Sequence, residues 1–154
     1  MKKLAVLAVA LLISMGVYAQ EKGVFRGQAG LVYGGDTELG INAGVQYFVS
    51  DKIAIAPSYS FFLKDFIGIR FSSFNIEGRY YFNEGLYGLA GFDIVRASGT
   101  INLGGLGSIG ASGSSTEIAL GAGYDLQLSG GTLLNLQAKY ANQIVLGGGI
   151  VFSF

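Results

Sequence analysis

The sequence predicts an all-β fold, an eight-stranded antiparallel up-and-down transmembrane β-barrel. Three observations lead to this prediction. The chain begins with a segment typical of a secretory signal, it alternates between apolar and polar residues along eight segments, and it ends in an alternating apolar strand whose last residue is the aromatic Phe154. A period of two is typical of β-strands, because successive side chains point to opposite faces of a sheet.

Residues 1–19 have the features of a cleaved secretory signal. Lys2 and Lys3 supply positive charge, residues 4–13 form an apolar run, and Val17-Tyr18-Ala19 is a small-residue cleavage motif. The apolar run is shorter than the roughly 20 residues that a membrane-spanning helix needs. We therefore expect a mature β-barrel domain of residues 20–154, exported to the outer membrane of a Gram-negative bacterium.

Composition supports strands and turns over helices. The chain has 26 Gly, one Pro and 51% hydrophobic residues, and Gly is costly inside helices. Ten basic residues balance ten acidic ones, and two of the basic residues lie in the expected signal. The mature chain is thus slightly acidic and has no polybasic footprint for nucleic acid. It has no Cys, which excludes disulfides and Cys-ligated metal.

Hydrophobic periodicity defines eight predicted strands after the signal. Most are close to the length of about 9 to 11 residues that a tilted membrane-spanning strand requires. In chain order, the predicted strands are residues 24–33, 38–49, 53–61, 73–82, 86–95, 116–126, 133–140 and 144–154.

One face of these strands is apolar and the other is polar. Ile41, Val45 and Leu120 are typical of the first face, whereas the second mixes charged and amide side chains with many Gly and Ala. A water-soluble barrel would show the same alternation with the faces exchanged. Two features favour lipid on the apolar face: it carries the large side chains, and its aromatic residues gather near strand ends, as in the girdles of membrane barrels.

The connections also alternate in length. Short turns are expected at residues 50–52, 83–85 and 129–131, and these would lie in the periplasm with both termini. The connections on the other side span residues 34–37, 62–72, 96–115 and 141–143, of which two are long. An even number of strands leaves no unpaired edge in the lipid, as a membrane-spanning sheet requires.

The interior of an eight-stranded barrel is just wide enough to be filled by side chains. We therefore expect the inward charges to pair in two clusters, one joining Glu77, Arg79 and Asp93 and one joining Lys139 and Glu117. A structural, hydrogen-bonded core is the favoured interpretation, and a narrow path for water or small cations is the alternative. The predicted lumen charge network consists of Arg26, Glu38, Glu77, Arg79, Asp93, Glu117, Asp125 and Lys139.

The Gly- and Ser-rich segment from Arg96 to Ser115 is expected to form a flexible outer loop. Alternatively, the alternation of Ile101, Leu103 and Ile109 extends the hairpin above the membrane, where its strand edges would act in adhesion by β-augmentation. In the other long connection, Lys64 and Arg70 are placed to meet lipopolysaccharide phosphates.

No enzymatic site is expected. The chain has no histidine, which is the commonest general base and a frequent metal ligand. The glycines of residues 104–113 have no Lys-Ser/Thr ending, so they do not form a phosphate-binding loop. We predict no catalytic residue, no metal site and no cofactor.

The signal, the eight alternating strands and the final aromatic strand together resemble the small eight-stranded outer-membrane barrels of the OmpX and OmpA type, within the porin-like outer-membrane β-barrel superfamily. The resemblance implies a monomer among outer-membrane lipid and lipopolysaccharide, delivered by the barrel-assembly machinery. It also implies that this machinery reads the terminal strand, at Leu146, Ile150, Phe152 and Phe154.

Together these observations predict an integral outer-membrane protein with a mainly structural or envelope-interaction role and a lumen filled by side chains. A low-conductance porin-like passage is the first alternative. A surface adhesin acting through the segment Arg96 to Ser115 is the second.

Overall fold

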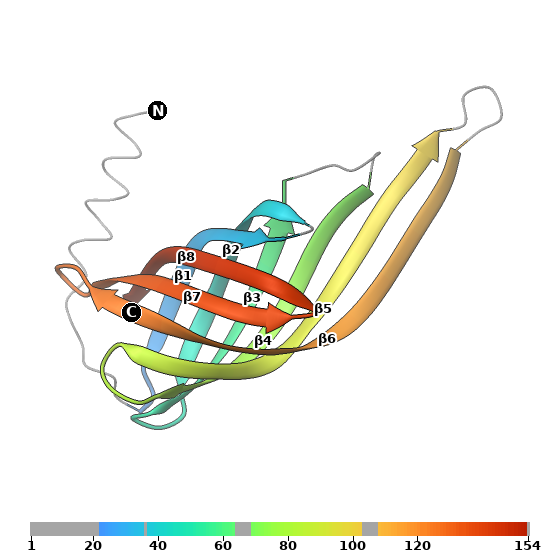
Figure 1. Ribbon diagram of the computed structural model, residues 1–154. Helices are drawn as coiled ribbons and strands as arrows, with labels where there is room; N and C mark the ends of the chain where they lie inside the picture. Colours follow the sequence, from blue (N-terminus) through green and yellow to red (C-terminus); the bar gives the residue numbers. More distant parts are fainter. Residues whose placement is uncertain (1–21, 36, 64–68, 103–107, 154) are drawn as a thin grey trace, which may run out of the picture.

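The computed structural model describes residues 22–35, 37–63, 69–102 and 108–153. They form a closed antiparallel barrel of eight strands in chain order (Figure 1). Every strand pairs with its neighbours in sequence, and β1 closes the barrel by pairing with β8, with Arg26 opposite Ser153. The strands are β1 Phe25–Gly34, β2 Glu38–Phe48, β3 Ile53–Phe62, β4 Ile69–Tyr81, β5 Leu86–Asn102, β6 Ser108–Gln127, β7 Thr132–Ala141 and β8 Gln143–Ser153.

The predicted orientation of the two faces is confirmed. Ile41, Val45 and Leu120 are 50%, 45% and 60% exposed on the outside of the barrel, whereas Glu77 and Arg79 are each only 1% exposed inside it. A water-soluble barrel would reverse this arrangement. The apolar exterior therefore matches a hydrocarbon solvent, and the polar side chains fill the lumen.

The predicted strands agree with the observed ones to within one residue at the bounds of β1, β2, β3, β7 and the start of β8. The prediction was wrong above the barrel, where β4 begins at Ile69 instead of Ser73. Strands β5 and β6 are also longer than predicted, with 17 and 20 residues.

The favoured interpretation of residues 96–115 as a flexible loop is thus corrected. The β5–β6 ladder continues to the pair Asn102 and Ser108, so the described residues on both sides of 103–107 form a projecting hairpin (Figure 1). Gly and Ser lower strand propensity, but continuous pairing with a neighbour satisfies the backbone groups of both strands.

The two ends of the barrel differ. At the turn end, β1 begins, β8 ends, and tight turns join β2 to β3, β4 to β5 and β6 to β7 (Figure 1). At the hairpin end, β5 and β6 extend beyond the other strands. No helix in the described ranges has the length and apolarity to span a membrane. The predicted signal of residues 1–19 and the terminal Phe154 lie outside the described residues.

Candidate functional site

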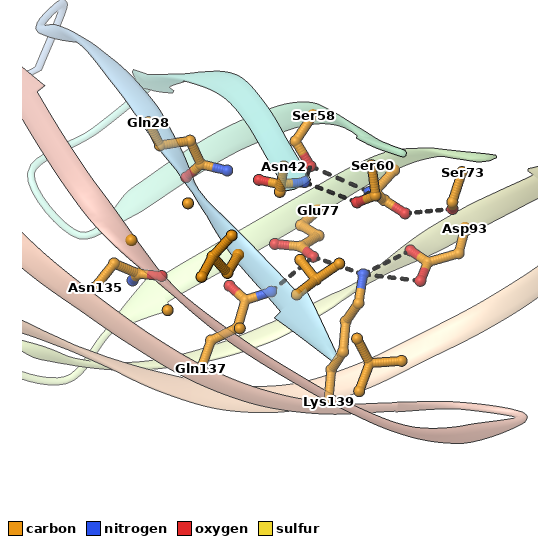
Figure 2. Close-up of a pocket in the computed structure, with 18 of the residues that line it drawn as sticks. Gln28, Asn42, Ser58, Ser60, Ser73, Glu77, Asp93, Asn135, Gln137 and Lys139 are labelled. Atoms are coloured by element: carbon orange, nitrogen blue, oxygen red, sulfur yellow. Dashed lines mark hydrogen bonds and ion pairs between the residues drawn. The ribbon is translucent and has the colours of Figure 1, made fainter. Parts of the chain in front are cut away.

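The centre of the lumen contains a network of four charged side chains. The Nζ atom of Lys139 on β7 lies 3.0 Å from Glu77 Oε1 and 2.8 Å from Asp93 Oδ2. Arg79 Nη2 donates to Glu77 Oε2 at 2.9 Å. Figure 2 shows Lys139 reaching between Glu77 and Asp93. Two cations thus neutralise two carboxylates, as burial of these charges requires.

Arg79 also connects this network to distant strands. Its Nη1 donates to Gln28 Oε1 on β1 at 3.1 Å, and its Nη2 donates to Gln137 Oε1 on β7 at 3.2 Å. The guanidinium carbon lies 5.0 Å from the centre of the Tyr87 ring, within the range of a cation–π contact. One side chain therefore ties together strands on opposite walls of the barrel.

An aromatic layer lies between this network and the turn end. Phe48, Tyr81 and Tyr87 are buried and belong to one apolar cluster, completed by Ala54 and Leu89. The ring centre of Tyr81 is 5.4 Å from that of Phe48 and 5.0 Å from that of Tyr87. We call Phe48, Tyr81 and Tyr87 the aromatic plug, since their rings fill the lumen.

The aromatic plug is not among the features expected from the sequence. We expected aromatic residues on the lipid face, but Phe48, Tyr81 and Tyr87 each neighbour an outward-facing residue in the chain and so lie on the inward face. Strict alternation along β2, β4 and β5 was the signal that would have found them. The hydroxyl groups of the two tyrosines form hydrogen bonds in the lumen: Tyr81 donates to Asp125 Oδ2 at 2.8 Å, and Asn135 Nδ2 donates to the Tyr87 hydroxyl at 2.7 Å.

Arg26 and Asp125 form a second charge pair next to the aromatic plug. Their closest atoms, Nη1 and Oδ2, are 3.9 Å apart, and the guanidinium lies 4.7 Å from the centre of the Phe48 ring. Asp125 also accepts from Asn135 Nδ2 at 2.7 Å. The pair lies towards the turn end, apart from the network around Lys139.

A hydroxyl and amide layer covers the central network on its other side. Asn42 Nδ2 donates to Ser60 Oγ at 2.8 Å, and Asn75 Nδ2 donates to the same oxygen at 3.1 Å. Ser73 donates to Asn75 Oδ1 at 2.6 Å. The cavity between these groups has a volume of only about 60 Å³ (Figure 2), enough for a few water molecules.

The pairings differ from the prediction for Lys139, Glu117 and Glu38. Lys139 does not pair with Glu117, because its long side chain crosses the lumen to Glu77 on β4 and Asp93 on β5. No hydrogen bond or ion pair reaches Glu117 from the described residues. Glu38 is exposed at the start of β2 with a φ of 58°, so it lies outside the buried network.

The predicted assembly-signal residues on β8 share the exterior face. Leu146 is exposed on this face, and Ile150 and Phe152 are half-buried along the same side of the strand. Within the described ranges, no group of three or more acidic, His or Cys residues is arranged to hold a metal ion.

Solved structures with the same fold are membrane barrels. The N-terminal β-barrel domain of OprF from Pseudomonas aeruginosa is 17% identical with a TM-score of 0.63, and the match covers 88% of this chain and all of that one. A de novo designed transmembrane β-barrel is 14% identical with a TM-score of 0.58, over 89% of this chain and 100% of the design.

The Yersinia pestis outer membrane protein Ail in a phospholipid bilayer nanodisc is 14% identical with a TM-score of 0.53, over 86% of this chain and 100% of Ail. No protein-family model and no curated protein matches the sequence. The fold is therefore that of the small eight-stranded transmembrane β-barrels.

Proposed function

We propose that the chain is an integral outer-membrane protein with a mainly structural or envelope-interaction role. The observation that carries this proposal is the pairing of an apolar exterior with a lumen filled by bonded side chains. Lipid is the solvent that suits the exposed Ile, Leu, Val, Phe and Tyr of the barrel wall. The fold shared with outer-membrane barrels supports the location, and the signal-like residues 1–19 support export.

A passage for water or small solutes is the less favoured alternative. The central network and the aromatic plug both lie across the lumen, and their side chains are joined by ion pairs, hydrogen bonds and ring contacts between strands. A solute would have to break buried ion pairs to pass, at a cost of several kcal/mol.

Two measurements test the structural role. Membrane-extracted protein should migrate differently in a gel before and after boiling, because a closed barrel resists detergent until it is heated. In planar bilayers the folded protein should then give no discrete conductance events. Regular single-channel steps would contradict the filled lumen and support the passage.

An adhesive role for the projecting hairpin is a second candidate. One edge of β6 pairs with β5 throughout, but β7 pairs only with residues 120–127. In the described part of the chain, residues 108–119 therefore present a strand edge without a ladder partner. Natural proteins block such edges with charged residues or proline. Residues 108–116 are exposed and contain neither. An extended peptide could pair there by β-augmentation.

Lysine substitutions on the exposed edge of β6 test the adhesive role. Cells carrying Gly110→Lys and Ser112→Lys should attach less to surfaces coated with extracellular-matrix protein, because edge lysines disfavour strand addition. Ser98→Lys is the matched control, since Ser98 lies opposite Ser112 on β5, which is flanked by strands on both sides. Equal attachment by all three proteins would contradict the adhesive role.

Two partners complete the proposal. Of the two basic residues expected to meet lipopolysaccharide, Lys64 lies outside the described residues and Arg70 lies on the exterior of β4, opposite Ser98. Arg96 lies on the exterior of β5, opposite Ser72. Arg70 and Arg96 are therefore diagonal neighbours just above the apolar band, a position suited to lipopolysaccharide phosphates. The alternating residues of β8 are proposed as the strand that the barrel-assembly machinery reads. The absence of histidine and cysteine supports a non-enzymatic role.

A further inference from the structure

The hairpin end of the lumen contains a cavity of about 420 Å³, which we call the vestibule. Phe71, Val95 and Ala97 give it apolar walls, and Asn142 and Gln143 supply amide groups. Glu117 on β6 is its only charged lining residue among those that the structure describes. A cavity of this size falls within the range that binds small molecules.

Among the described residues, Glu117 is the inward carboxylate that no cationic side chain neutralises. Asp93 lies directly opposite Glu117 in the β5–β6 register, but Lys139 holds Asp93 at 2.8 Å. Arg79 and Lys139 balance Glu77 and Asp93, and Arg26 lies beside Asp125. The carboxylate of Glu117 therefore keeps one negative charge that these ion pairs do not balance, and it lies on the wall of the vestibule.

The composition of the vestibule selects the kind of cation. Hard metal ions such as Ca²⁺ take six to eight oxygen ligands, several of them carboxylates, and no such acidic group exists in the described residues. A single half-buried carboxylate in a cavity that Phe71 and Val95 also line suits instead a monovalent organic cation with an apolar part. Its N–H groups would donate to the carboxylate, and its apolar part would pack on Phe71 and Val95.

We propose that the vestibule binds small organic cations of this class, primary ammonium compounds that carry an aromatic or aliphatic group. Glu117 accepts the charged hydrogen bond, and Phe71 and Val95 bury the apolar group. The site opens at the hairpin end and is closed below by the central network and the aromatic plug. This inference goes beyond the structural role, since a filled inner lumen is compatible with either an empty or an occupied vestibule.

The proposal is tested by fluorine NMR titration of the full barrel, folded in nonionic detergent, with 4-fluorobenzylammonium. The neutral 4-fluorobenzyl alcohol serves as the uncharged comparison. We expect the ammonium to bind at least about tenfold more tightly than the alcohol, because only the ammonium forms a charge-assisted hydrogen bond. No binding of the ammonium, or equal binding of the two compounds, would overturn the proposal.

Two variants locate the binding in the vestibule. Glu117→Gln keeps the shape and should lose about tenfold in affinity for the ammonium. Val95→Lys should abolish binding. Val95 lies diagonal to Glu117 in the ladder, so the lysine amine would form an ion pair with the Glu117 carboxylate in place of the ligand. Glu84→Gln removes one charge in the turn between β4 and β5, at the opposite end, and should bind like the natural chain.

Heat-modifiable gel migration verifies that each variant is folded before titration. Unchanged affinity in Glu117→Gln would show that the ammonium binds elsewhere and would overturn the assignment. Failure of this site would leave the structural role untouched, because that role depends on gel migration and conductance.

Discussion

At the scale of single residues, the lumen is stabilised by side chains that cross it. Lys139 bonds to carboxylates on β4 and β5, and Arg79 contacts amides on β1 and β7. The alternating pattern placed Glu77, Arg79, Asp93 and Lys139 on the inward face, and the expected pairing of Glu77 with Arg79 is confirmed. The partner expected for Lys139 was wrong, because comparing adjacent strands does not show that long side chains in a narrow barrel meet across the interior.

Replacing Arg79 with alanine should destabilise the barrel by about 3–5 kcal/mol, because Glu77 loses its closest buried partner. Urea unfolding of protein folded into phospholipid vesicles, followed by circular dichroism, measures this change in the free energy of unfolding. Arg96→Ala, on the exposed exterior of β5, is the control and should change it by no more than about 0.5 kcal/mol. Similar losses in both variants would contradict a stabilising network.

The same Arg79→Ala protein should not conduct ions in planar bilayers. The aromatic plug stays in place when the guanidinium is removed, since Phe48, Tyr81 and Tyr87 contact one another directly. Discrete conductance steps in Arg79→Ala alone would show that the network, and not the plug, closes the lumen.

A second residue-scale prediction concerns the space for Tyr87. A Cβ atom at Gly123 would overlap Tyr87 Cζ and Oη and would lie 2.9 Å from the Leu136 carbonyl oxygen. Gly123→Ala should therefore cost roughly 1–3 kcal/mol of the free energy of unfolding, as overpacked cores do. Gly113→Ala on the same strand has open space around its Cβ and is the control. Equal stability of the two variants in urea would contradict the tight fit.

At the scale of elements, the main difference from the sequence analysis lies in β5 and β6. Residues 96–102 and 108–115 carry so many Gly and Ser that composition favours a flexible loop. The structure instead continues the ladder, because each backbone group finds its partner on the facing strand. Local composition therefore wrongly predicted a flexible loop. Continuous backbone pairing between the two segments makes them strands instead.

A disulfide tests whether this hairpin has a fixed register. Ser98 and Ser112 face each other across the ladder, at a separation that disulfides tolerate. The double variant Ser98→Cys with Ser112→Cys should oxidise readily, and because the chain has no other cysteine, thiol titration reports it directly. Ser98→Cys with Gly113→Cys places the thiols on opposite faces and should stay reduced. Rapid oxidation of both pairs would indicate a mobile loop.

At the scale of the whole molecule, the barrel is asymmetric along its axis. The aromatic plug and the Arg26–Asp125 pair fill the turn end, whereas the vestibule is at the hairpin end. Placing the short turns in the periplasm directs the hairpin and the vestibule to the cell exterior. The role proposed for the hairpin and the ligand proposed for the vestibule both depend on this orientation.

Thiol labelling of intact cells checks the orientation. A cysteine at Thr100, exposed on β5, should react with a maleimide too large to cross the outer membrane. A cysteine at Asp51, exposed in the turn between β2 and β3, should react only after the membrane is permeabilised. Labelling of Asp51→Cys in intact cells would show that the tight turns face the cell exterior and would contradict the proposed orientation.

The amino-acid sequence alone predicted the number of strands, the positions of the three tight turns and which face of each strand is apolar. These properties are local, since a period of two and the turn residues act within one strand or one connection. The closed barrel settled which charges pair, placed three inward aromatic rings across the lumen, and left Glu117 without a cationic side chain among the described residues. Those outcomes depend on distances across a closed cylinder, which bring together side chains from strands that are not neighbours in the sequence.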